Sequence, residues 1–175
     1  MVAGKSTESA RLNATSLALE SDREIVIGRT FNGPARIVFD AWTRPELVRR
    51  WWAPTSLGDA GVTFDADIRV GGRYRYVLRA GTGHTFAFTG TYIEVTPHSR
   101  LVYTQIFEPT ASGAAPGESG ITVTVTFDEQ DGRTRLVEHV QCPSKDVRDA
   151  ILASGMEHGM RESMDQLDEL VASLL

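Results

Sequence analysis

Apolar and polar residues alternate with a period of two along most of this chain, a pattern typical of strands that bury one face. The alternation is clearest where Ile121, Val123, Val125 and Phe127 fall on one face and threonines on the other. Clusters of Gly, Pro and Asp separate the alternating segments. We therefore expect seven strands, the last six in an antiparallel meander, at residues 24–31, 62–68, 73–78, 85–95, 101–107, 121–127 and 134–141.

Residues 32–52 interrupt the alternation and are predicted to form two short helices. Gly33 can cap the first helix, with Pro34 in its first turn. Thr43 and Glu46 have the spacing of a capping box that opens the second helix. The break between the helices is therefore expected at the Thr-Arg-Pro sequence that begins at Thr43.

Three tryptophans, Trp42, Trp51 and Trp52, fall within eleven positions of this helical pair. Such a large apolar group must be buried against a sheet or line a cavity. Trp51 and Trp52 are adjacent, so they cannot both face inward from the end of a helix. We expect one of them to gate a pocket and the other to cover the edge of the sheet.

After Pro143 the apolar period changes to 3.6, and Ser144 is placed as an N-cap. The apolar stripe runs through residues 145–174 and predicts one long C-terminal helix. Gly155 and Gly159 lie on or beside this stripe, and each weakens a helix by about 1 kcal/mol relative to Ala. Either close packing of the helix on the sheet or a need for space beside it would explain them.

The element order β-α-α-β6-α is typical of the α+β helix-grip fold. In this fold a curved antiparallel sheet, here of about seven strands, wraps round the long C-terminal helix. The strongly bent sheet stands away from the helix at one end, which leaves a cavity. We expect residues 23–175 to form this single domain and residues 1–22 to be a poorly ordered arm.

Charge and composition narrow the classes of partner. The net charge is −5, and acidic and basic residues are scattered without a basic stripe, so no nucleic-acid partner is expected. No apolar run has the length of a signal peptide or a membrane span, which predicts no membrane partner and a cytoplasmic location. Cys142, the one cysteine, fits a reducing compartment and is expected to be a small buried hydrophobe.

Two loops differ in their predicted behaviour. Residues 109–120 are rich in Pro, Gly, Ala and Ser, and we expect this loop to be mobile. Asp131 and Gly132 form a common hairpin-turn pair and are expected to join two strands.

Templates for catalysis and metal binding fail on spacing. His84, His98, His139 and His158 form no pair at the intervals of metal ligands. The chain has no Gly-x-Ser-x-Gly elbow and no dinucleotide-binding glycine loop, and Cys142 has no evident base. We therefore expect no metal, no cofactor and no conventional hydrolase chemistry.

Alternation also predicts which polar groups face inward. If Leu101 faces the core, Tyr103 and Gln105 on the same strand do so too. By the same rule, Leu136 brings Glu138 inward. A buried carboxyl needs a partner or a raised pKa, and such groups cluster at functional sites. The alternative is a one-residue bulge that turns Glu138 to solvent, where an arginine near the preceding turn would pair with it.

A candidate binding site follows from these faces. Methionines recur at four-residue steps along the final helix and would line the wall opposite the sheet, although ordinary core packing explains them equally well. Tyr74, Tyr76 or Tyr103 on the sheet could donate a hydrogen bond to the inward carboxyl. We expect Glu138, Gln105 and Tyr103 to hold the polar end of a ligand and Trp52, Tyr76, Met156 and Met160 to pack against its body.

Short motifs occur in a fixed order along residues 24–174: Pro34 with Val38-Phe39-Asp40-Ala41-Trp42, Thr43-Arg44-Pro45-Glu46 with Trp51-Trp52, Asp67-Ile68-Arg69-Val70-Gly71-Gly72-Arg73-Tyr74, Gly90-Thr91-Tyr92-Ile93-Glu94-Val95-Thr96-Pro97 with Arg100-Leu101, and Thr134-Arg135-Leu136. Together they resemble the activator of heat-shock-protein-90 ATPase homologue-like (AHSA-like) family of the SRPBCC superfamily, which shares the START and birch-pollen-allergen fold. A His-x-x-Gly-Trp pattern is common in the last helix of that family. Here Met160 follows His158 and Gly159, so the resemblance implies a pocket of altered shape.

The family that this chain resembles includes ligand carriers and relatives of polyketide cyclases and aromatases, so the resemblance implies a function of one of these kinds. Stimulation of the chaperone is not expected, because its activators resemble two-domain proteins and the segment before Glu24 is too short for their separate N-terminal domain.

Our leading hypothesis is noncatalytic binding of a small apolar or aromatic molecule between the sheet and the final helix. The first alternative is a cyclase or lyase in which Glu138 or His139 acts as acid or base. The second is a protein-interaction module, chaperone-activator-like protein or homodimer that uses an exposed tryptophan and a sheet edge.

Overall fold

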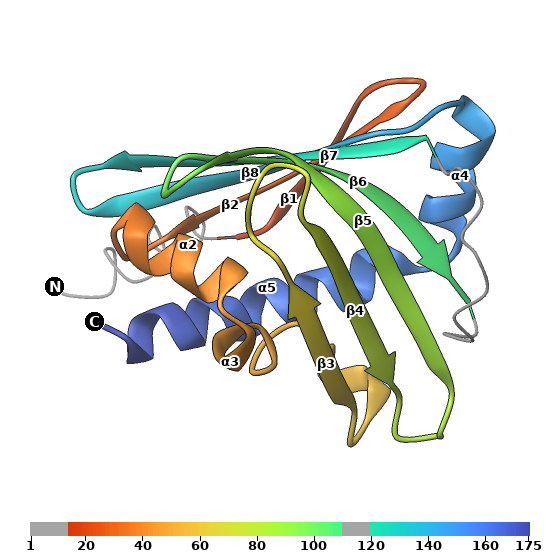
Figure 1. The fold of residues 1–175 in the computed structure, drawn as a ribbon, viewed down its shortest axis with the longest axis horizontal. Helices are drawn as coiled ribbons and strands as arrows, with labels where there is room; N and C mark the ends of the chain where they lie inside the picture. The colour runs from red at the N-terminus through yellow and green to blue at the C-terminus, as the bar shows by residue number, and fades with distance from the viewer. Residues whose placement is uncertain (1–13, 110–119) are drawn as a thin grey trace, which may run out of the picture.

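One antiparallel sheet forms the body of the protein in the computed structural model, which describes residues 14–109 and 120–175. Within these residues the sheet has eight strands in the spatial order β1-β2-β8-β7-β6-β5-β4-β3, and it is strongly curved (Figure 1). The strands are β1 (Ser16–Ser21), β2 (Glu24–Phe31), β3 (Gly61–Ala66), β4 (Arg73–Arg79), β5 (Thr85–Thr96), β6 (Arg100–Glu108), β7 (Ile121–Gln130) and β8 (Arg133–Gln141).

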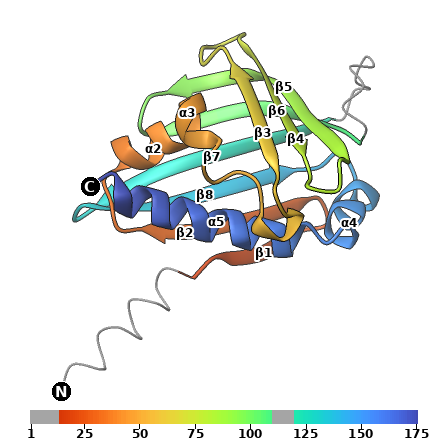
Figure 2. The same cartoon turned by 90° about the horizontal axis from the view of Figure 1, so that it is seen from below.

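The helices lie on the concave side of this sheet. Figure 2, which views the molecule from below, shows α5 crossing in front of the sheet, with α2 and α3 beside its C-terminal half and α4 at the opposite end. These elements are α2 (Ala35–Thr43), α3 (Pro45–Val48), the short 3-10 helix η1 (Thr55–Leu57), α4 (Lys145–Ala153) and α5 (Met156–Ser173). The expected α+β helix-grip architecture is confirmed.

The seven expected strands all form, and their ends lie within a few residues of the predicted ones. β1 is an additional edge strand in the segment expected to be a poorly ordered arm, and it pairs with β2 from Ser16 opposite Gly28. Its sequence has only Leu17 and Leu19 in alternation, a pattern too short to predict a strand, and five of its six residues are exposed. Residues 1–13 of the arm and 110–119 of the loop lie outside the described residues.

The prediction of a single C-terminal helix from the apolar stripe is wrong, because the structure has two helices there, α4 and α5. Gly155, with a φ of 78°, ends α4 and precedes α5 in a left-handed conformation that glycine adopts easily. The expected N-cap is confirmed, because the Ser144 hydroxyl accepts a hydrogen bond from the Val147 N–H at 3.2 Å. At Gly159, an added Cβ would lie 3.0 Å from Pro54 Cγ, so this glycine permits close packing of α5 on the segment after α3.

The capping predictions for the first two helices are also wrong. Pro34 itself is the residue that precedes α2, and the Ala35 N–H donates to a Glu129 carboxylate oxygen at 2.8 Å. Arg44, not Thr43, precedes α3, no side chain caps that helix, and the Thr43 hydroxyl instead donates back to the Phe39 carbonyl at 2.8 Å. The Asp131-Gly132 turn does form between β7 and β8, with both residues at positive φ, as its sequence predicts.

The core fills the space between the concave face and the helices. Its fully buried side chains come from the sheet and from α2, α3 and α5, and they include Phe31, Val38, Val48, Leu136 and Leu167. Cys142 is buried, as expected. Within the described residues, no helix is long and apolar enough to cross a membrane.

Candidate functional site

Glu138 lies on the inner face of β8, as alternation predicted. It is opposite Ile27 of β2 and Val125 of β7, both of which are buried. The register of both pairings is continuous, so the bulge that would have turned Glu138 to solvent is absent from these strands. The side chain is half-buried. Burial raises the pKa of the Glu138 carboxyl from 4.5 to about 7, and no hydrogen bond or opposite charge within the described residues lowers it again.

Four tyrosines form a cluster on the same face, at β4, β5 and β6. The Tyr74 ring lies 5.3 Å from the Tyr103 ring and 5.5 Å from the Tyr92 ring, between ring centroids. Tyr76 lies 5.6 Å from Tyr74 on the same strand. Burial, followed by the neighbouring carboxyl and phenols, raises the pKa of Tyr103 well above 10. The tyrosines therefore remain neutral hydrogen-bonding groups at physiological pH.

Small residues allow the cluster and the carboxyl to approach. Val123 is opposite Tyr103 on β7, and Val125 is opposite Glu138, so short side chains occupy the strand between them. The Glu138 carboxyl contributes to the raised pKa values of Tyr74, Tyr76 and Tyr103, which places its charge near all three phenols.

Tyr76 is also the centre of an aromatic stack. Its ring lies against Phe64 on one side, at 4.3 Å between centroids and 15° between planes. It lies against Trp52 at 4.6 Å and 16°. Phe88 meets Trp52 edge-on at 5.4 Å. The stack continues the tyrosine cluster as one aromatic surface towards the β3 edge of the sheet.

The structure assigns different positions to the adjacent tryptophans. Trp51 is buried against Trp42, with ring centroids 4.9 Å apart, and its indole N–H donates to the Ala41 carbonyl at 2.8 Å. Trp52 is half-buried and faces Tyr76. Trp42 is buried as well, so Trp52 is the tryptophan that stays partly accessible.

Helix α5 holds the Trp51–Trp52 segment in place. The Ser163 hydroxyl donates to the Trp52 carbonyl at 3.0 Å. The Gln166 amide donates to the Trp51 and Ala53 carbonyls, both at 2.8 Å. These side chain to backbone bonds fix the end of α3 on the helix that covers the sheet.

Of the seven residues predicted to bind a ligand, four form one contiguous group: Trp52, Tyr76, Tyr103 and Glu138. Gln105 is half-buried on the same face of β6 as Tyr103. Met156 and Met160 belong to the covering helix and are partly buried against the core. Met164, at the next four-residue step, is fully packed at 2% exposure, which is the ordinary core role weighed above.

Three aromatic residues of this surface, Phe64, Phe88 and Tyr92, were not predicted as part of the site, and Tyr74 was considered only as a hydrogen-bond donor to Glu138. Period-two alternation could have found them, because Tyr74 and Tyr76 share a face of β4, and Phe88 and Tyr92 share a face of β5. Gly90 lies between the last two and opposite Tyr74, where a Cβ would come within 2.7 Å of the Tyr74 ring. This glycine leaves room for the tyrosine.

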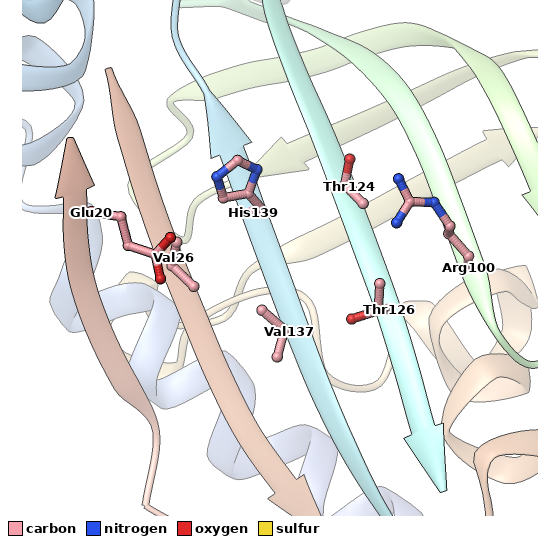
Figure 3. Close-up of a pocket in the computed structure, with 7 residues that line it drawn as sticks. All are labelled: Glu20, Val26, Arg100, Thr124, Thr126, Val137 and His139. Carbon is pink, nitrogen blue, oxygen red and sulfur yellow. The ribbon is translucent and has the colours of Figure 1, made fainter. Parts of the chain in front are cut away.

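The outer face of the sheet carries the other acid–base candidate, His139. Its ring nitrogen lies 3.1 Å from a Glu24 carboxylate oxygen. Since His139 faces away from Glu138, the prediction that either could act on one ligand is wrong for His139. It lines a surface hollow of about 330 Å³ with Glu20, Val26, Arg100, Thr124, Thr126 and Val137 (Figure 3).

Two of the titratable side chains around this hollow, Arg100 and His139, already have partners. Arg100 pairs with Glu94 at 3.1 Å, and His139 pairs with Glu24. Threonines and valines make up most of the remaining lining. We therefore regard the inner face as the stronger candidate site. Across the described part of the chain, no group of three His, Cys, Asp or Glu side chains is placed to hold a metal ion.

Comparison with known proteins agrees with this architecture. A family model described as Activator of Hsp90 ATPase homolog 1-like protein matches residues 32–172. Protein Ms6760 of Mycobacterium smegmatis has a similar structure, with a TM-score of 0.79 at 23% identity over 92% of this chain and 99% of that one. A Rhodobacter sphaeroides protein reaches 0.76 at 24% identity over the same shares of the two chains.

An AHSA1-like protein from Aeromonas hydrophila has a TM-score of 0.62 at 22% identity, with 83% of this chain and 92% of that chain covered. At these identities the likeness shows the fold. A comparison with curated proteins finds no match.

Proposed function

The chain belongs to the Activator of Hsp90 ATPase homolog 1-like family, and we propose that it binds a small apolar or aromatic molecule between the sheet and α5. Helix-grip proteins of this kind commonly bind hydrophobic ligands. The proposal assigns the aromatic surface and the methionines of α5 to the body of the ligand, and Glu138 with the tyrosine hydroxyls to its polar end.

The observation that carries the proposal is the partial exposure of inward-facing side chains. Trp52, Phe88, Gln105 and Glu138 point to the concave side, yet each is only half-buried. Elsewhere on that face, residues such as Ile25, Val123 and Leu136 are sealed at 0% exposure. Water therefore reaches the inner face at the aromatic surface, and a ligand that covers it would remove apolar area from water, at about 25 cal/mol per Å².

Binding can be tested with N-phenyl-1-naphthylamine, an uncharged aromatic dye that fluoresces in apolar surroundings. We expect saturable binding that Trp52→Ala weakens by about tenfold or more, because Trp52 supplies a stacked face of the aromatic surface. Thr124→Ala, on the outer face, is the matched control and should leave the affinity unchanged. Absence of binding, or equal effects of the two substitutions, would contradict the proposal.

The natural ligand can be sought in the same protein. Native mass spectrometry of the purified protein, followed by denaturing extraction, would detect a small molecule that leaves with it. A discrete adduct whose release accompanies dye binding would place both in the same site.

A second candidate function is acid–base catalysis by Glu138. The observation that favours it is the pKa of about 7, which suits a group that exchanges protons near neutral pH. Glu138→Gln distinguishes the two functions. A carrier should keep its affinity for an uncharged ligand within about tenfold, whereas an enzyme that uses Glu138 as acid or base should lose on the order of a hundredfold in rate.

A further inference from the structure

Two charged side chains point inward from neighbouring strands of the sheet, and only one of them has charged partners. Arg29 of β2 pairs with Asp165 and, at 3.1 Å, with Asp168, both on α5. Its guanidinium also donates to the Thr15 hydroxyl at 3.0 Å. Glu138 of β8 has no ion pair or hydrogen bond within the described residues, and burial alone accounts for its raised pKa.

The surroundings of Glu138 make this a site of uncompensated negative charge. The polar groups that its charge influences are the phenols of Tyr74, Tyr76 and Tyr103, whose oxygens carry lone pairs and whose ring faces are electron-rich. Arg29, the cation on the neighbouring strand, is turned towards α5 and is already paired with two carboxylates. No cation of the described residues therefore compensates an ionised Glu138, so a cation that enters from outside the chain would stabilise it.

We propose that the ligand carries a protonated amine, which the Glu138 carboxylate and the neighbouring tyrosines of the concave face bind as an aromatic-lined cation site. This inference rests on the proposed function, because the amine enters with the aromatic or apolar body described above. The amine N–H groups donate to the carboxylate and to phenol oxygens. The aromatic rings add cation–π attraction, which reaches about 2 kcal/mol where water is excluded.

Other polar groups fit this arrangement less well. A ligand carboxylate or phosphate would meet a like charge at Glu138 and no free cation among the described groups that line the cluster. A neutral hydroxyl could donate one hydrogen bond but would leave the carboxylate charge uncompensated. A protonated amine supplies both the charge and the donors.

The affinity for the amine should depend on pH through the titration of one group, Glu138. Around Glu138, the phenols of Tyr74, Tyr76, Tyr92 and Tyr103 stay neutral from pH 6 to pH 8, because burial raises their pKa values. Arg29, the inward-facing charged side chain of the neighbouring strand β2, is held in its ion pairs with α5. Between pH 6 and pH 8 Glu138 passes from mostly protonated to mostly ionised, so amine affinity should rise about tenfold.

Three probes with one aromatic body and different charges test the inference: 2-phenylethylamine, 2-phenylethanol and 3-phenylpropionate. Their affinities would be measured by calorimetry and saturation-transfer NMR at pH 6 and pH 8. At pH 8 we expect the amine to bind at least about tenfold more tightly than the alcohol, and the carboxylate to bind most weakly. The affinity of the alcohol should not change with pH.

The variant Glu138→Gln should reduce amine affinity to that of the alcohol and remove its pH dependence. Glu24→Gln makes the same chemical change on the outer face and should preserve the ranking of the probes. If the alcohol binds as tightly as the amine, the inference fails and the proposed function stands. If none of the three binds, both fail. If the amine keeps its advantage in Glu138→Gln, it binds elsewhere and the inference is wrong.

Discussion

The inner face of the sheet has a closed part and an open part, and the two treat buried charge in opposite ways. In the closed part, under the C-terminal half of α5, Arg29 is 6% exposed and is held by two aspartates, a threonine and the ring of Phe31. In the open part, Glu138 faces phenols and has no charged partner within the described residues. An unpaired carboxyl that is removed from water does not stabilise a fold. We therefore assign Arg29 a role in stability and Glu138 a role in binding.

The largest expected effect comes from removing the partners of Arg29. The double variant Asp165→Asn with Asp168→Asn leaves a buried guanidinium without a carboxylate, because both acids that pair with it are gone. We expect a loss of about 3–5 kcal/mol in the free energy of unfolding, measured by urea denaturation at pH 7.

A compensating substitution distinguishes charge from packing in that experiment. Adding Arg29→Met to the double variant removes the buried charge and should recover a large part of the loss. Lys145→Gln, which removes an exposed ion pair with Asp149, should change stability by less than about 0.5 kcal/mol. If the double variant is as stable as the parent protein, water must solvate the Arg29 charge once the aspartates are gone. The distinction between the closed and open parts would then fail.

The adjacent tryptophans extend the comparison, since Trp51 belongs to the closed part and Trp52 to the open part. In Trp51→Phe the Ala41 carbonyl loses its donor near the end of α2, and the buried ring shrinks. We expect a loss of about 2–3 kcal/mol in the free energy of unfolding with little effect on binding of the uncharged dye. Trp52→Phe should show the reverse pattern, a smaller loss of stability and a weaker dye affinity. Equal effects on both readouts would contradict this assignment.

Much of the open part could be predicted because it lies on regular strands. Alternation placed Glu138 and Tyr103 inward correctly, since β8 and β7 pair without a register shift and each residue keeps its face. Alternation also places Tyr74 and Tyr92 on the inner face, although the predicted ligand-binding residues did not include them. The neighbouring tryptophans could not be assigned from sequence, because a helix end permits either orientation and tertiary packing decides.

The closed part was less predictable for a different reason. Arg29 is a charged residue in an otherwise apolar stripe, and its partners on α5 are more than a hundred residues away along the chain. Only the assembled fold brings them together. The break at Gly155 was missed because the apolar period continues through it, whereas the left-handed backbone that ends α4 leaves no periodic signal.

Glu138→Gln should affect stability in the direction opposite to the aspartate substitutions. The native carboxyl, with a pKa of about 7, holds a proton that the unfolded chain releases near pH 4.5, so wild-type stability from this group falls as pH rises through that window. At pH 8 we expect the variant to be more stable than the parent by about 1–3 kcal/mol, and at pH 4 to be nearly equal.

That prediction is checked by urea denaturation of both proteins at pH 4, 6 and 8. Subtracting the free energy of unfolding of one protein from that of the other at each pH cancels the contributions of the other titrating groups. A constant difference across pH would mean that Glu138 is ionised with an ordinary pKa in the native protein. The open part would then hold a solvated carboxyl, and the contrast with Arg29 would be lost.

The smallest expected effect comes from the outer face. His139→Gln removes a ring that pairs with Glu24 at the surface, where both side chains are between a fifth and a third exposed. We expect a change of less than about 0.5 kcal/mol in stability, no change in dye affinity and no change in the titration of Glu138. NMR of a sample labelled at the glutamate side-chain carboxyl carbon would follow that titration directly. Because His139 is the residue after Glu138, a shift of the Glu138 pKa in this variant would show that the two faces of β8 are electrostatically coupled. A constant pKa would mean that the sheet isolates Glu138 electrostatically from His139. Glu138 would then exchange protons at the concave face without any contribution from His139.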